Sequence, residues 1–176
     1  MIIDIPIGRQ TFDFDCGAKA LQIVMAFYGI DMREDELIKE LKTDRNGTMA
    51  KNMISVAEKK GFQVVAKSGV SLKTVKKYVD ENHPVIVILQ AWAERYMTIE
   101  DWKEDNEDGH YVIIIGFQGD IIVFEDPASF RRTWLTEGEF LARWHAMDPG
   151  TQEKFEHFAM VLLGKQPAKK ALEHMG

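Results

Sequence analysis

The sequence predicts an α+β fold, in which a helical first half packs on an antiparallel sheet formed mainly by the second half. Early in the chain, apolar residues recur at helical spacing. Later, a β-branched run occupies Val85–Leu89, and two apolar segments flank a turn over residues 111–124. Because helices come first and strands follow, instead of alternating along the chain, a doubly wound parallel sheet is not expected.

The helical half is predicted from apolar periodicity and from residues that begin or end helices. Gly29 and Gly61 are expected to end the first and third helices, and Ser71 is a candidate N-cap for the fourth. The four helices are expected over Cys16–Tyr28, Glu34–Lys42, Gly47–Lys60 and Leu72–Asp80.

The sheet is predicted from β-branched and apolar runs. Gln118–Asp120 is a turn signal, so the segments on either side of it form a β-hairpin. Thr136 and Glu139 have the spacing of a capping box, which begins a helix that continues to Trp144. The strands are expected over Phe62–Ala66, Val85–Leu89, Tyr111–Phe117, Ile121–Phe124 and Phe158–Leu163.

Between the second and third of these strands, residues 91–109 carry seven acidic side chains and no clear periodicity. The simplest interpretation is a solvated loop. The functional alternative is a cleft wall that selects basic or extended peptides. Trp92 lies in this segment, where it either packs the loop down or contacts a substrate.

Length and composition limit the classes of protein that fit. With 176 residues, we expect one domain over residues 1–164 and a frayed tail over 165–176. A net charge of -6, with no stripe of Lys and Arg, argues against nucleic-acid binding. No secretory signal and no bilayer-length apolar run is visible, which predicts a cytoplasmic protein without membrane insertion. The histidines lack metal-ligand spacing, and we expect neither a metal ion nor a cofactor.

Cys16, the single cysteine, stands at the start of the first predicted helix. There, unpaired backbone N–H groups and the positive end of the helix dipole favour a thiolate over a thiol. A buried, inert cysteine is the alternative. A reactive Cys16 would need a base and a group that orients this base elsewhere in the chain, whereas an inert cysteine would need neither.

His110 and Asp126 are the candidate partners, one at the entry to the predicted hairpin and one at its exit. With a three-residue loop at 117–119 they would lie directly opposite each other, and another loop type would shift the register by a residue or two. A carboxylate beside an imidazole fixes its tautomer and stabilises its charged form. Taken singly, His110 could be an ordinary strand-edge histidine and Asp126 a turn residue before Pro127.

Together, these residues resemble a known family, the papain-like cysteine peptidases that cut leader peptides after double glycine and are found in bacteriocin-exporting transporters. The matching motifs follow the family order from about Ile5 to Trp144. They are Gln10, Asp15-Cys16-Gly17, Tyr28-Gly29, Gly47-Thr48, Gly61-Phe62, Pro84–Val87, Gly109–Val112, Asp126-Pro127-Ala128, Phe140 and Trp144.

The resemblance implies a papain-like fold and a role for each matching residue. Cys16 would be the nucleophile, His110 the general base and acid, and Asp126 the residue that orients His110. The Gln10 side-chain amide and the Cys16 backbone N–H would form the oxyanion hole. Gly17, Gly109 and Trp92 are candidate substrate-binding residues.

The expected activity is hydrolysis of a peptide or protein substrate through an acyl-enzyme on Cys16, with cleavage after Gly-Gly-like sites. The chain would be a stand-alone member whose partner is a separate transporter or a precursor peptide. Two alternatives stay open. The same three side chains also serve acyltransferases of the transglutaminase kind, which pass the acyl group to an amine. A non-catalytic peptide-binding module could use the same fold.

Overall fold

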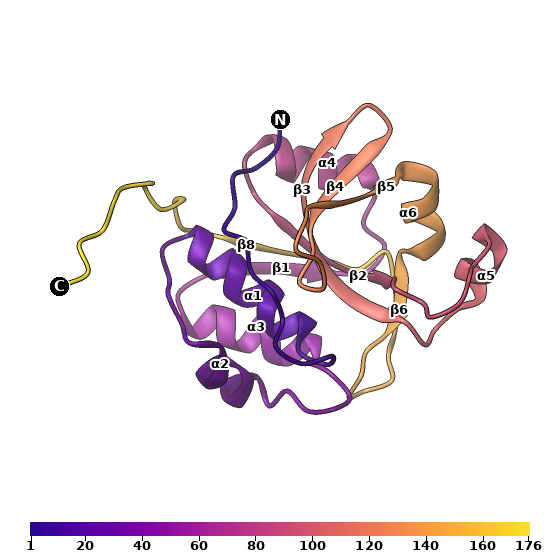
Figure 1. Cartoon of the computed structure of the whole chain (residues 1–176), viewed down its shortest axis with the longest axis horizontal. Coiled ribbons are helices and arrows are strands. Elements are labelled where there is room, and N and C mark those ends of the chain that lie inside the picture. Colours follow the sequence, from indigo (N-terminus) through magenta and orange to yellow (C-terminus); the bar gives the residue numbers. More distant parts are fainter.

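The computed structural model describes all residues 1–176 and places a layer of three helices against a six-stranded antiparallel sheet (Figure 1). In this sheet the strand order is β1-β8-β2-β3-β4-β5, and a separate pair is formed by β6 and β7. The helices are α1 (Cys16–Phe27), α2 (Glu34–Leu41), α3 (Ala50–Lys59), α4 (Leu72–Asp80), α5 (Ile99–Glu104) and α6 (Glu137–Arg143). The strands are β1 (Gln63–Lys67), β2 (Val85–Gln90), β3 (Gly109–Gln118), β4 (Ile121–Glu125), β5 (Thr133–Thr136), β6 (His145–Met147), β7 (Lys154–Glu156) and β8 (Ala159–Leu163).

This arrangement confirms the predicted fold class and all four helices of the first half. The helix α3 begins at Ala50 instead of Gly47, because Gly47 has a φ of 116°, far outside the helical region. The Ser71 hydroxyl accepts a hydrogen bond from the Thr74 N–H, as expected of an N-cap. The sheet then separates α1–α3 from α4 and α6 (Figure 1).

In the second half, the sequence interpretation missed β5, β6, β7 and α5. The expectation of a loop throughout 91–109 was wrong, because α5 lies inside this segment. There the Thr98 hydroxyl accepts a hydrogen bond from the Asp101 N–H, and the Asp101 carboxylate accepts one from the Thr98 N–H. Trp102 buries its side chain, so this helix is anchored to the fold.

The hairpin differs from its predicted register. Gln118 pairs with Ile121, so the turn consists of the two residues Gly119 and Asp120, not three residues at 117–119. An irregularity between Ile114 and Gly116 then moves the ladder back by one residue, which leaves an offset of two residues from the predicted register. His110 and Asp126 are therefore not directly opposite each other.

The extra residue in β3 has a partner elsewhere in the chain. The Ile115 carbonyl accepts a hydrogen bond from the Ile3 N–H at 2.7 Å, and Ile2 forms a bridge with Gly116. A Cβ on Gly116 would stand 2.8 Å from the Met1 carbonyl oxygen, so this close approach requires glycine. The bulge thus fixes the N-terminal segment that leads to Cys16.

A single cluster of 43 buried hydrophobic side chains joins the helical layer to the sheet. Residues 165–176 form no helix or strand, although the Ala168 N–H donates to the Phe27 carbonyl at the end of α1. No helix of the chain is long and apolar enough to cross a lipid bilayer.

Candidate active site

Cys16 is the first residue of α1, and the packing of that helix on β3 sets its position. The Cys16 Sγ accepts a hydrogen bond from the Tyr111 backbone N–H at 3.5 Å. Gly17 is buried, and a Cβ added to it would stand 3.0 Å from both the Thr48 Cβ and the Tyr111 ring. A larger residue there would push α1 away, so Gly17 has a packing role in placing the sulfur beside β3.

His110 and Asp126 meet, as expected, although their strands are offset. Ile113 pairs with Glu125, and continuing that register sets His110 two residues away from the position opposite Asp126. Residues two apart in a strand share a face, so a diagonal contact is open to these side chains. The His110 Nε2 lies 2.7 Å from the Asp126 Oδ1, with both side chains buried.

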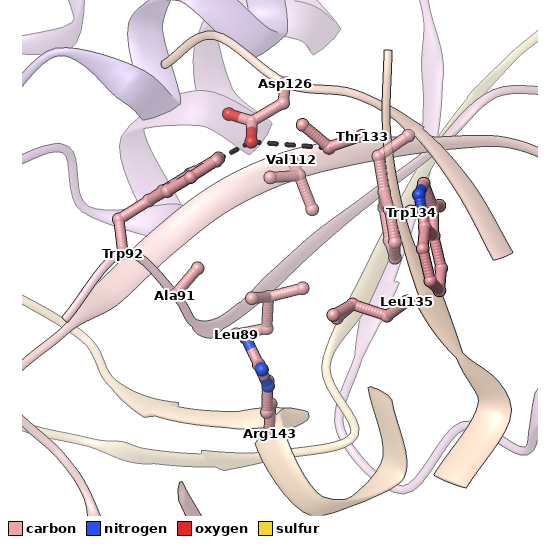
Figure 2. Close-up of a pocket in the computed structure, with 10 residues that line it drawn as sticks. Leu89, Ala91, Trp92, Val112, Asp126, Thr133, Trp134, Leu135 and Arg143 are labelled. Carbon is pink, nitrogen blue, oxygen red and sulfur yellow. Dashed lines mark hydrogen bonds between the residues drawn. The ribbon is translucent and has the colours of Figure 1, made fainter. Parts of the chain in front are cut away.

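Three further donors converge on the Asp126 carboxylate. The Ala128 N–H donates to Oδ1 at 2.8 Å, while the Trp92 indole N–H, at 3.0 Å, and the Thr133 hydroxyl, at 3.4 Å, donate to Oδ2 (Figure 2). Burial on its own would raise the pKa of Asp126. The hydrogen bond and charge of His110, aided by Ala128 and Trp92, instead hold that pKa below its ordinary value.

Trp92 therefore packs on the site, which agrees with the packing interpretation, and it also lines an open pocket. Its backbone has a φ of 63°, in the left-handed region that bulky residues rarely adopt. Such a conformation costs about 1–3 kcal/mol and persists only where the surrounding contacts fix it. The contact with Asp126 is one such constraint.

The environment of His110 favours the imidazolium form. Burial opposes the charge and on its own would lower the pKa of His110. Hydrogen bonding to Asp126 and to Cys16, with the negative charge of both groups, outweighs burial and raises that pKa to about 10. The imidazole thus has a carboxylate hydrogen-bonded to its Nε2 and the Cys16 sulfur near enough to favour its charged form, and a thiol that exchanges a proton with a base needs such a neighbour.

Gln10 lies in the loop before α1, and its backbone N–H donates to the Pro127 carbonyl, next to Asp126, at 2.9 Å. Its side-chain Nε2 donates to the Phe12 carbonyl at 2.6 Å, and its Oε1 is buried without a partner. An amide nitrogen carries two hydrogens, so this bond leaves one free. These two hydrogen bonds hold the loop in place, as a structural role would require, and one hydrogen of the side-chain amide stays available for an oxyanion.

The loop that carries Gln10 is held by Glu125, which the sequence interpretation did not single out. The buried Glu125 carboxylate accepts from Arg9 Nη1 at 2.7 Å and from the Gly8 N–H at 3.2 Å, and it also pairs with Arg132. Arg132 in turn donates to the Ile5 carbonyl at 3.0 Å. Neighbouring residues thereby hold two parts of the site: Glu125 holds the loop before Cys16, and Asp126 holds the imidazole of His110.

A cleft of about 380 Å³ has Cys16 and Gly109 among its lining residues. Gly109 begins β3, and a Cβ there would meet nothing closer than the Ala146 Cβ, at 3.8 Å. Gly109 therefore leaves open the part of the cleft that a side chain at this position would fill. Gln10 is not among the lining residues.

One end of this cleft is closed by the loop between β6 and β7. The buried Asp148 side chain accepts from the Ala50 N–H, at the start of α3, at 3.0 Å, and from the Thr151 hydroxyl at 2.8 Å. Across the cleft, a Cβ on Gly47 would stand 3.2 Å from the Pro149 ring. Asp148 thus joins the sheet half to the helical half next to the cleft.

Next to Cys16 in the chain, Asp15 interacts with a second carboxyl group, that of Glu34. Asp15 is buried and accepts from the Phe12 N–H at 3.0 Å and the Thr11 N–H at 3.2 Å. Burial, and next the hydrogen bond and charge of Glu34, raise the pKa of Asp15 to about 6 against the pull of these N–H donors. The site therefore includes a titratable group adjacent to Cys16 in the chain.

The fold is shared with solved peptidase domains. The peptidase domain of Streptococcus ComA, a bi-functional ABC transporter involved in quorum sensing, is 24% identical with a TM-score of 0.64, over 89% of this chain and 96% of that one. A double glycine motif protease from an AMS/PCAT transporter, solved with its leader peptide, is 19% identical with a TM-score of 0.64, over 92% of each chain. A putative C39-like peptidase from Bacillus anthracis is 16% identical with a TM-score of 0.69, over 95% of this chain and 98% of that one.

Residues 2–151 match the Peptidase_C39-like family, and the chain belongs to that family. Among curated proteins, the mesentericin-Y105 transport/processing ATP-binding protein MesD of Leuconostoc mesenteroides is 23% identical over 139 residues. That match covers 77% of this chain but only 17% of MesD. The family resemblance inferred from the motifs is confirmed.

Proposed function

We propose that the protein is a cysteine peptidase that hydrolyses peptide bonds through an acyl-enzyme on Cys16. The observation that carries this proposal is the order of three groups. The His110 Nε2 lies 2.7 Å from the Asp126 carboxylate, and the nearby Cys16 sulfur contributes to the raised pKa of the imidazole. Nucleophile, base and orienting group are thus in the order that covalent catalysis requires.

In the acylation step, the Cys16 thiolate attacks the carbonyl carbon of the scissile bond. The Cys16 backbone N–H and the free hydrogen of the Gln10 amide are the proposed donors to the oxyanion. The His110 imidazolium gives its proton to the leaving amine, which departs as the C–N bond breaks. Asp126 keeps its negative charge and holds the ring by accepting from Nε2–H.

In the deacylation step, neutral His110 takes a proton from water, and the resulting hydroxide attacks the thioester. The carboxylic acid leaves and the Cys16 thiolate is restored beside a protonated His110. The proton count thereby balances over one turnover, and no cofactor enters either step.

The substrate we propose is an extended peptide with small residues before the scissile bond. Gly109 leaves part of the cleft open, while Gly47 and Pro149 approach each other closely across the cleft. Similarity to a double glycine motif protease solved with its leader peptide, and to the mesentericin-Y105 transport/processing protein, supports cleavage after a Gly-Gly pair. A precursor peptide is accordingly the proposed partner.

The test combines thiol reactivity with product analysis. Iodoacetamide should alkylate Cys16 rapidly at pH 6 in the wild type and much more slowly in His110→Ala, which loses the neighbouring cation. A Gly-Gly peptide incubated with the wild type and millimolar amine should yield a free carboxyl terminus by mass spectrometry. Alkylation no faster than that of free cysteine would refute the activated thiol. Amine adducts as the main product would replace the peptidase with an acyltransferase.

A further inference from the structure

We propose that the pocket beside Asp126 binds an acidic side chain of the substrate, on the leaving-group side of the scissile bond, with Arg143 as its ionic partner. The inference rests on the proposed peptidase function and names a specificity site for it. It follows from an unpaired cation, the apolar walls around it, and the position of both relative to His110.

The pocket has a volume of about 210 Å³ and mostly apolar walls (Figure 2). Leu89 of β2, Val112 of β3 and Leu135 of β5 form part of its lining, with Trp92 and Trp134 as aromatic walls. A space of this size accepts one amino-acid side chain rather than a helix. Its apolar walls strengthen any charge interaction made inside it.

Arg143 is the last residue of α6 and the only basic residue that lines this pocket. Figure 2 shows its nitrogen-bearing end pointing toward Leu89. The guanidinium also packs 4.0 Å from the centroid of the Trp102 ring. Arg143 is half-buried, and burial lowers its pKa against the opposing charge of Glu139.

No acceptor in the chain is bonded to this guanidinium. Its Nε is buried without a partner, and Arg143 takes part in no hydrogen bond or ion pair. The nearest carboxylate along α6, Glu139, is engaged at the start of the helix, where it accepts from the Thr136 N–H and hydroxyl, each at 2.9 Å. A partly desolvated cation without a partner is costly, and a planar guanidinium favours a carboxylate over other anions of similar size.

The pocket carries a second charge, Asp126, but that charge is already compensated. Both of its oxygens accept hydrogen bonds, from His110 and Ala128 on one side and from Trp92 and Thr133 on the other. Arg143 has the Trp102 ring and the charge of Glu139 nearby but no hydrogen-bonded acceptor, so it is the charge of the pocket that an anionic occupant would pair with.

The sheet places this pocket and the Cys16 cleft on opposite sides of β3. Val112 lines the pocket, whereas its neighbour Tyr111, which points to the other face of the strand, lines the cleft together with Gly109 and Cys16. The pocket and the cleft share no lining residue. When the acyl half of the substrate occupies the cleft, the leaving half extends past His110, which protonates it, toward Trp92 and the pocket.

The experiment compares two sets of quenched-fluorescence peptides with Gly-Gly before the scissile bond and an amidated C-terminus. One set carries Glu at the first, second or third position after the bond, and the matched set carries Gln there. The kcat/KM ratio of Glu to Gln should reach about tenfold at one position in the wild type, which is about 1.4 kcal/mol. In Arg143→Gln this ratio should fall to about one, and in Arg143→Lys it should keep an intermediate value because the charge is retained.

Arg131→Gln is the matched control, since Arg131 is exposed and makes no ion pair. It should keep the full ratio. Equal kcat/KM for Glu and Gln peptides at all three positions would overturn the inference. So would an equal loss of the ratio in Arg131→Gln, which would indicate general charge attraction. The inference would also be overturned if Gln peptides with a free C-terminal carboxylate, in place of the amide, were cleaved as well as the Glu peptides. Arg143 would then recognise the terminal carboxylate of the substrate.

A binding measurement separates this inference from the proposed function. The same peptides are titrated against Cys16→Ala, with tryptophan fluorescence as the signal. If no peptide is cleaved but Glu peptides bind about tenfold more tightly than Gln peptides, and Arg143→Gln removes this difference, the peptidase proposal fails and the pocket assignment holds. If cleavage occurs but the two sets bind and react equally, the pocket assignment fails alone.

Discussion

Asp148→Ala tests whether the loop between β6 and β7 joins the two halves of the molecule. The Asp148 side chain is the acceptor for the first N–H of α3, whose N-cap residue, Met49, makes no side-chain cap. The same side chain fixes its own loop through Thr151. Removing it leaves the buried Ala50 N–H without an acceptor and releases the loop.

The expected cost follows from these bonds. Loss of a helix-capping acceptor costs about 1 kcal/mol, within a range of about 0.5–2. An unsatisfied buried donor and the lost Thr151 contacts bring the total to about 3 kcal/mol. For a chain of this length each kcal/mol lowers Tm by about 2–4 °C, so Asp148→Ala should melt about 6–12 °C below the wild type.

Differential scanning calorimetry of three variants measures this effect. Asp148→Asn keeps one acceptor oxygen and should lose about half as much. Asp31→Ala removes an exposed aspartate that makes no side-chain hydrogen bond, and its Tm should stay within about 1 °C of the wild type. An Asp148→Ala protein that melts within 2 °C of the wild type would show that the loop does not join the two halves.

Three further changes test the residues around Cys16 and His110. Gln10→Ala should lower kcat by about 10²–10³ with little change in KM, Tm or the rate of Cys16 alkylation, because the bond to the oxyanion strengthens only in the transition state. A lower Tm with a normal kcat would instead show that Gln10 has a structural role. Trp92→Phe removes one hydrogen-bond donor to Asp126 and should therefore raise the pKa of that carboxyl group. The loss in kcat/KM should be only about fivefold, since Trp92 is more than half exposed and its hydrogen bond is screened by solvent. A pH–rate profile identical to that of the wild type would contradict this prediction. Asp15, with a pKa raised to about 6, contributes stability that is complete below its ordinary value near 3.8 and is lost as pH rises through 6. Urea denaturation should show wild-type stability falling between about pH 4 and 6 relative to Asp15→Asn, which does not titrate, and then levelling off. Parallel curves would count against the shift.

The fold was predictable where a segment carries its own periodicity or end signals. The apolar spacing after Cys16 and the β-branched run from Val85 are local patterns, and both elements were confirmed. The capping box of Thr98 and Asp101 was readable too, but the surrounding acids obscured it. The strands β5–β7 are three or four residues long, too short to show alternation.

The site was predictable only in part, because several of its contacts join distant positions. Chain order and hairpin geometry brought His110 and Asp126 together even though the assumed turn was wrong. The contact between Trp92 and Asp126 spans 34 positions, and that between Arg9 and Glu125 spans 116. Arg143 belongs to no local sequence motif. Its proposed role in substrate binding depends on the pocket around it, which distant segments of the chain form together.

The packing of α1 on β3 has a consequence for heating. Cys16 belongs to the helical layer and His110 to the sheet, so the separation of sulfur and ring is set by how closely the two layers pack. A slight loosening between layers would lengthen it while each layer keeps its own hydrogen bonds. The alkylation rate of Cys16 relative to that of free cysteine should therefore fall at temperatures below the cooperative melt, as a sub-global opening would require. The alkylation rate of Cys16 would then measure how closely the helical layer packs on the sheet, at temperatures where the chain is still folded.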